Sequence, residues 1–204
     1  MNLSKYLVSL SLFPLLIAAM VSVASGQTTD ATGQQLAEPT YEVALHVVIG
    51  SNETASSADM PPAIANVVRG LRGNFPFSNY RLASTLLGRV SNTGTIEYKS
   101  VSNIVGQADA ESHTFIEWSM TNLRAVPNGF QARSFRFGAR VPIRIGTSKD
   151  SSGTNSPVVN YESVGLMLSM VGLPANTPTL VGTVSLPKTS GTIFLFATVR
   201  PAAM

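Results

Sequence analysis

One stretch of the chain, residues 133–145 (RSFRFGARVPIRI), alternates between apolar and polar side chains over its whole length. Successive side chains of a β-strand point to opposite faces of the sheet, so the pattern predicts a strand with one buried face. Gly138 indicates a bulge or bend, and Pro142 an edge position or a local break. The apolar face comprises Phe135, Phe137, Ala139, Val141, Ile143 and Ile145.

Turn signals divide the rest of the chain into further strands. Segments 80–90 and 95–101 flank a four-residue turn, so we expect them to pair as a hairpin. Segment 192–199 (TIFLFATV) is apolar on both faces, which predicts burial on both sides or contact with lipid. The other predicted strands are 41–49, 112–123, 130–145, 158–171 and 179–186.

A single helix is predicted between the first two strands. Asp59 is a candidate cap, and Pro61 and Pro62 suit a first turn. The helical spacing that follows, closed by Gly73, is that of Ile64, Val67, Val68 and Leu71. The predicted fold class is therefore α+β and β-rich, with a β-α-β start and then an antiparallel multi-stranded sheet or sandwich. We expect one domain over 41–201, with a division into 41–106 and 107–201 as the alternative.

The first 26 residues have the layout of a secretory signal peptide. Lys5 precedes an uncharged apolar run, residues 6–24, and small residues follow at 24–26. An uncleaved anchor helix is the alternative, because the run is long enough to span a bilayer. Residues 27–40 are polar and predict a flexible leader. The expected location is therefore exported: periplasmic, outer-membrane-associated or secreted.

Composition excludes several classes of function. The 204 residues include no cysteine, so disulfides, thiolate zinc sites and a cysteine nucleophile are ruled out. Lys and Arg number 14 against 11 Asp and Glu, and this net charge of +3 is too small for the basic stripe of a nucleic-acid binder. We predict no metal and no cofactor.

The sequence does not predict an enzyme, since it contains no nucleotide-binding or hydrolase signature. His46 lies within an apolar strand and is expected to be a core or interface residue. His113 and Glu117 could form an acid–base pair, but a solvated strand face explains them equally well. Trp118 shares a face with Ile116 and Met120, which indicates a place in the core rather than a sugar-stacking surface.

Three arginines, Arg136, Arg140 and Arg144, lie on the polar face of 133–145. They are either the solvated side of a half-buried strand or a site for anionic lipid, polysaccharide or phosphate. At about 3.3 Å per residue they span about 26 Å, which suits an extended polyanion better than a small ligand.

Within residues 130–201 a strand with a glycine is followed by a Val-Pro pair, a polar insert and then Tyr-x-x-Val-Gly with alternating Leu. The positions of this pattern are Gly138, Val141, Pro142, Gly146, Tyr161, Val164, Gly165 and Leu168. The pattern resembles the core β-domain of bacterial secretins, the outer-membrane pores of secretion systems and type IV pili. The resemblance implies a non-enzymatic envelope protein.

Insert 147–157 is too short and polar for a membrane-crossing hairpin. We therefore expect sheet-mediated assembly or docking, with an envelope protein or with itself, rather than a pore. A binding module for an anionic envelope polymer, using the three arginines, is the alternative.

Overall fold

The computed structural model describes residues 38–52, 60–75, 77–102, 113–149, 153, 155–186 and 191–202, all within the unit Glu38–Met204. The expected signal peptide, most of the expected leader and the expected helix cap Asp59 lie outside these residues. In the part of the chain that is described, no helix is both long and apolar enough to cross a membrane.

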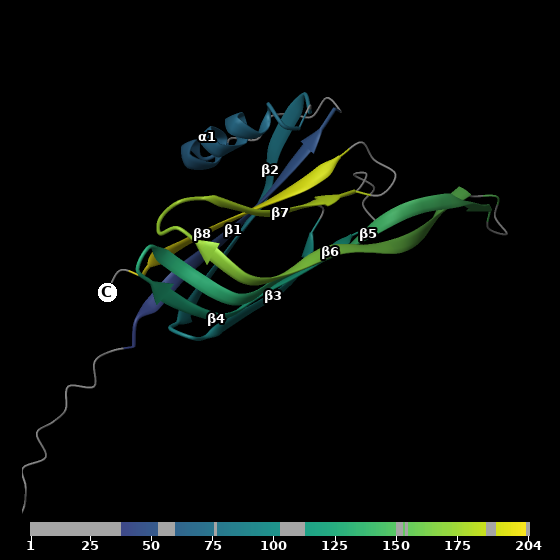
Figure 1. The fold of residues 1–204 in the computed structure, drawn as a ribbon. Helices are drawn as coiled ribbons and strands as arrows, with labels where there is room; N and C mark the ends of the chain where they lie inside the picture. The colour runs from purple at the N-terminus through teal and green to yellow at the C-terminus, as the bar shows by residue number, and fades with distance from the viewer. Residues whose placement is uncertain are drawn as a thin grey trace, which may run out of the picture. The chain divides into compact units, whose positions relative to one another are not determined.

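These residues form eight strands and one helix (Figure 1). The strands are β1 (Thr40–Ser51), β2 (Asn79–Ser91), β3 (Thr95–Ser102), β4 (Thr114–Val126), β5 (Gly129–Lys149), β6 (Asn155–Leu173), β7 (Thr179–Ser185) and β8 (Thr192–Pro201), and the helix is α1 (Pro62–Leu71). The prediction of a β-rich fold with a short helix is confirmed. Each predicted strand is found, and β5 and β6 run further than the sequence pattern indicated.

Four strands form the first sheet, in the order β2-β1-β8-β7, and each neighbouring pair is antiparallel. β8 therefore lies between β1 and β7. Its side chains are buried on both faces, with Ile193 and Leu195 in one hydrophobic cluster and Phe194 and Phe196 in another. Segment 192–199 is therefore buried on both sides, which is the first of the two interpretations made from the sequence.

The second sheet contains β3, β4, β5 and β6 in that order, again antiparallel throughout. Alternation along β5 places Phe135 and Phe137 in the larger hydrophobic cluster. Leu45 and Val47 of β1 belong to the same cluster, so the apolar faces of both sheets contribute to one core.

The helix α1 packs on the other face of the first sheet. Its residues Ile64 and Val68 share a cluster with Phe194 and Phe196 of β8. Pro62 stands in the first turn, where the missing N–H has no intrahelical partner to lose. Although α1 separates β1 from β2 in the sequence, these two strands pair directly and antiparallel.

The predicted hairpin of 80–90 with 95–101 is wrong. Within the described residues β2 pairs with β1 and β3 pairs with β4, so the turn between them carries the chain from one sheet to the other. Ile96 of β3 lies over Gly88 of β2, where an added Cβ would come within 2.5 Å of the Ile96 Cδ1. The strands stack rather than pair, because both turn apolar side chains to the shared core.

Two details of β5 also differ from the prediction. Gly138 pairs with Gly165 without any break in register, so it makes no bulge. The register shift lies instead between Arg144 and Gly146, and Ile145, predicted to share the buried face, is 58% exposed. A bulge redirects the side chain that it contains, which accounts for the exposure of Ile145.

Candidate functional site

The three candidate arginines lie on the exposed face of β5, which is the outer face of the second sheet. Side chains of that face on β4 and β6 are placed beside them by the strand register. Ser119 and Met167 flank Arg136, Phe115 and Ser163 flank Arg140, and Val159 is the partner of Arg144.

Arg136 is engaged by a carboxylate of the neighbouring strand. Its Nη2 donates to Oε1 of Glu117 at 3.2 Å. Glu117 has room to lie across the sheet because Gly138 stands opposite it; a Cβ at Gly138 would be 3.2 Å from Cγ and Oε1 of Glu117. Both partners are largely exposed, so the pair contributes little stability, but it offsets the charge of Arg136.

Arg140 is held by aromatic rings. Its guanidinium carbon lies 5.8 Å from the ring centroid of Phe115 and 5.6 Å from that of Tyr161, and the two centroids are 5.7 Å apart. A guanidinium in such positions is attracted to the electron-rich ring faces. Arg140 is thus fixed in place with its charge retained.

Arg144 lies beyond the end of β4, on a part of β5 that pairs only with β6 among the described residues. Within those residues neither Arg140 nor Arg144 has a carboxylate at ion-pair distance. The structure therefore places the three arginines in one row but in three different environments: ion-paired, stacked on rings, and exposed.

Two glycines of the secretin-like motif, Gly138 and Gly165, lie where the neighbouring strands approach closely. Gly138 and Gly165 are directly opposite each other on β5 and β6. A Cβ at Gly165 would fall on the carbonyl oxygen of Phe137 and lie 3.1 Å from the Cα of Gly138. The close approach of these two backbones requires glycine at position 165.

The remaining motif positions are structural as well. Pro142 pairs with Tyr161 beyond the last β4–β5 pair, so among the described residues it has a strand neighbour on one side only, the kind of edge position in which sheets tolerate proline. Gly146 borders the register shift. Val141 is buried, and Val164 and Leu168 pack against the main core.

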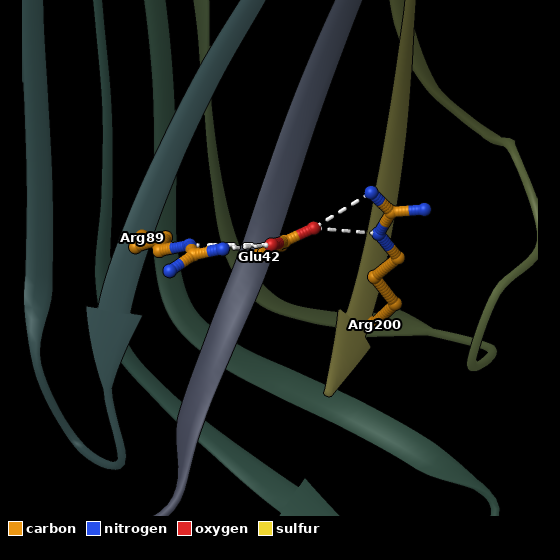
Figure 2. A network of polar contacts seen from close by, with 3 residues as sticks. All are labelled: Glu42, Arg89 and Arg200. Atoms are coloured by element: carbon orange, nitrogen blue, oxygen red, sulfur yellow. Dashed lines mark hydrogen bonds and ion pairs between the residues drawn. The ribbon is translucent and has the colours of Figure 1, made fainter. Parts of the chain in front are cut away.

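A second polar arrangement, which the sequence analysis missed, lies on the outer face of the first sheet. Glu42 of β1 stands in register between Arg89 of β2 and Arg200 of β8 (Figure 2). Arg89 donates from Nη2 at 2.6 Å and from Nε at 3.2 Å to Oε1 of Glu42. Arg200 donates from Nε to Oε2 of Glu42 at 2.7 Å, and its Nη2 lies 2.7 Å from the same oxygen.

The two arginines act on the titration of Glu42. The hydrogen bond from Arg89 and then that from Arg200 hold the pKa of Glu42 below its usual value of 4.5, against a smaller opposing effect of burial. Glu42 is therefore a carboxylate at neutral pH. With two guanidiniums around one carboxylate, this row carries a net charge of +1.

His46 lies on the same face of β1 as Glu42. Its Nδ1 is 3.0 Å from the hydroxyl oxygen of Thr85 on β2. Burial lowers the pKa of His46 below its usual value of 6.5, so the ring is neutral at pH 7. His46 is therefore half-buried on the outer face and belongs to neither hydrophobic cluster, so it does not have the expected place in the core, and the interface position stays a prediction.

A hollow of about 610 Å³ opens on this face, lined by the charged row, His46, Ala44, Leu87 and Thr198. Leu87 is 71% exposed, and the hydroxyl oxygen of Thr198 is buried without a hydrogen-bond partner among the described residues. Alternation of Glu42, Ala44 and His46 on one strand face was visible in the sequence. The register that brings β2 and β8 beside them was not.

Two of the other sequence candidates, Glu117 and Trp118, have structural partners. Glu117 is engaged by Arg136, and Trp118 is buried in the core, as predicted. No group of three His, Asp or Glu side chains within the described residues is placed to hold a metal ion.

No protein-family model and no curated protein sequence matches the chain. Among solved structures it is similar to the Salmonella SPI-1 type III secretion injectisome secretin InvG in its open gate state, at 8% identity and a TM-score of 0.35, over 84% of this chain and 63% of that one. The V. cholerae type IV competence pilus secretin PilQ matches at 11% identity and a TM-score of 0.30, over 82% and 58%. The chain thus spans about three fifths of these structures and has a weak fold resemblance to secretins.

Proposed function

We propose that this chain is a non-enzymatic exported bacterial envelope protein that works by sheet-mediated assembly or docking. The contact surface is the end of the β5–β6 hairpin, 141–149 and 155–162, called the arm below. The arm runs on past the last β4–β5 pair (Figure 1), and none of the described residues pairs with its outer edges. Strand edges with free N–H and C=O groups accept further strands, and this observation carries the proposal.

Apolar side chains on the arm support the same function. Ile145 is 58% and Val158 38% exposed, and both lie at the register shift of β5 and β6. Burial of these two apolar side chains against a partner removes apolar surface from water and so favours association. The partner is an envelope protein or a second copy of this chain.

The wider organisation forms part of the proposal. Residues 1–26 act as the signal peptide, which directs the protein to the periplasm, the outer membrane or the outside of the cell. The leader predicted over 27–40 ends before Thr40, because that residue belongs to β1. Residues 41–201 act as one domain, with the two sheets packed as a sandwich. Support comes from the sharing of one core by both sheets and from the pairing of β1 with β8.

Size-exclusion chromatography with light scattering, with and without detergent, tests the assembly. We expect an oligomer or co-purification with envelope proteins, lost in the double variant Ile145→Ser, Val158→Ser. Met170→Ser is the matched control, because Met170 is 57% exposed on the same sheet, near the end of β6 opposite to the arm. A monomer under all conditions that retains no envelope protein, or a loss of assembly in the control as well, would contradict the proposal.

A second candidate function is binding of an anionic envelope polymer by Arg136, Arg140 and Arg144. It is favoured by the absence of carboxylate partners for Arg140 and Arg144 among the described residues. Binding to anionic lipid vesicles and to alginate should weaken with salt, because exposed charges are screened within about 8–10 Å. Replacement of all three arginines by Gln should abolish this binding, whereas Arg124→Gln should retain it. If the two variants bind equally well, this hypothesis is wrong.

A further inference from the structure

The hollow on the outer face of the first sheet has the dimensions of a small-molecule site. Its volume of about 610 Å³ lies in the range of ligand pockets, roughly 300–1,000 Å³. The charged row Arg89, Glu42 and Arg200 forms part of its lining, and Ala44 and Leu87 supply apolar side chains. We propose that the hollow binds a small carboxylate that bears an apolar group, an activity separate from the docking role of the arm.

The charge of the row selects the ligand. Arg89 and Arg200 each turn Nε and Nη2 to Glu42, which leaves both Nη1 groups without a partner among the described residues. A guanidinium presents its N–H groups in a fixed fork that suits a carboxylate. One added carboxylate brings the row from +1 to neutrality, whereas an ammonium group would be repelled.

The hydroxyl of Thr198 adds a second polar contact. It is buried at the wall of the hollow with no hydrogen-bond partner among the described residues, and such a group costs free energy. Rotation about its Cα–Cβ bond exchanges the hydroxyl for the methyl group. The hydroxyl can then donate a hydrogen bond to a carboxylate oxygen in the hollow, while the apolar part of the ligand covers Leu87.

Isothermal titration of the purified protein with N-acetyl-leucine and with N-acetyl-leucinamide tests the proposal, since the two probes differ mainly in charge. We expect saturable binding of the acid and binding of the amide about tenfold weaker. Octanoate, titrated in parallel, separates the two sources of such a carboxylate. Tighter binding of octanoate points to a fatty acid, and tighter binding of N-acetyl-leucine points to a peptide C-terminus.

Variants give effects of opposite sign. Glu42→Gln removes the internal competitor and should tighten binding of N-acetyl-leucine, while Arg200→Gln and Leu87→Ser should weaken it about tenfold. Arg124→Gln, on the second sheet, should leave it unchanged. Circular dichroism establishes that each variant is folded. Absence of saturable binding of both acids up to about 10 mM, equal binding of acid and amide, or weaker binding by a folded Glu42→Gln variant would overturn the proposal.

Discussion

Replacement of Gly165 by Ala tests the close approach of β5 and β6 most directly. The added Cβ would fall on the Phe137 carbonyl oxygen, well inside the 3.0 Å that real Cβ atoms keep, and the Gly138 Cα would be 3.1 Å away. Both obstacles are backbone atoms of a paired strand, so neither can move without disturbing the ladder. Gly138→Ala is the matched control, because its Cβ would meet only the Glu117 side chain, which can swing away.

The expected cost follows from two opposing effects. Overpacking of this kind destabilises a fold by about 1–3 kcal/mol. The lower entropy of alanine in the unfolded chain returns about 0.5–1 kcal/mol. We therefore expect Gly165→Ala to lower the free energy of unfolding by about 1–2 kcal/mol and the Tm by roughly 2–8 °C. Gly138→Ala has the same entropic gain and loses only an exposed ion pair, so its stability should change by less than about 1 kcal/mol.

Urea unfolding followed by the fluorescence of Trp118, the one tryptophan of the chain, measures both variants. Trp118 is buried in the main core, so its emission reports global unfolding. Equal stabilities of the two alanine variants would refute the assignment of Gly165 to a backbone contact. A larger loss for Gly138→Ala would refute the register of β5 and β6 at this point.

Two further predictions concern the first sheet. The pKa of Glu42 is lower in the folded chain than its unfolded value near 4.5, so its stabilising effect is complete above that pH and disappears as pH falls through the folded value. The difference in urea midpoint between the wild type and Glu42→Gln should therefore shrink below pH 4.5 and on addition of salt; a constant difference would be evidence against the pairing with Arg89 and Arg200. Phe194→Ala should lower the free energy of unfolding by about 3–5 kcal/mol, because Phe194 is fully buried against Phe75, Phe77 and Tyr80. Calorimetry measures this loss, and a loss below about 1 kcal/mol would mean that α1 and the loop after it do not pack on Phe194.

The sequence predicted what depends on local alternation. The buried face of residues 133–143, the core position of Trp118 and the two-sided burial of 192–199 each follow from side-chain periodicity within one strand. Ile145 broke the pattern because the bulge that contains it cannot be recognised without the partner strand.

Strand partners could not be predicted in the same way. A short turn between two strands favours a hairpin, yet β2 pairs back across α1 with β1 and β3 pairs with the following β4, so the two strands join different sheets. The row of Arg89, Glu42 and Arg200 depends on the same long-range register, and residues 42 and 200 are 158 positions apart. Local patterns therefore located the arginines of β5 but not the hollow.

The pairing of β1 with β8 has a consequence for how the protein is made. The first sheet joins the earliest described strand to the latest, so a nascent chain cannot complete it until residues 192–201 have been synthesised. Contacts of such long sequence separation slow folding, because a long loop must close before they form. The second sheet is built from the consecutive strands β3 to β6 and does not wait for β8, so the delay concerns the first sheet and the core that the two sheets share.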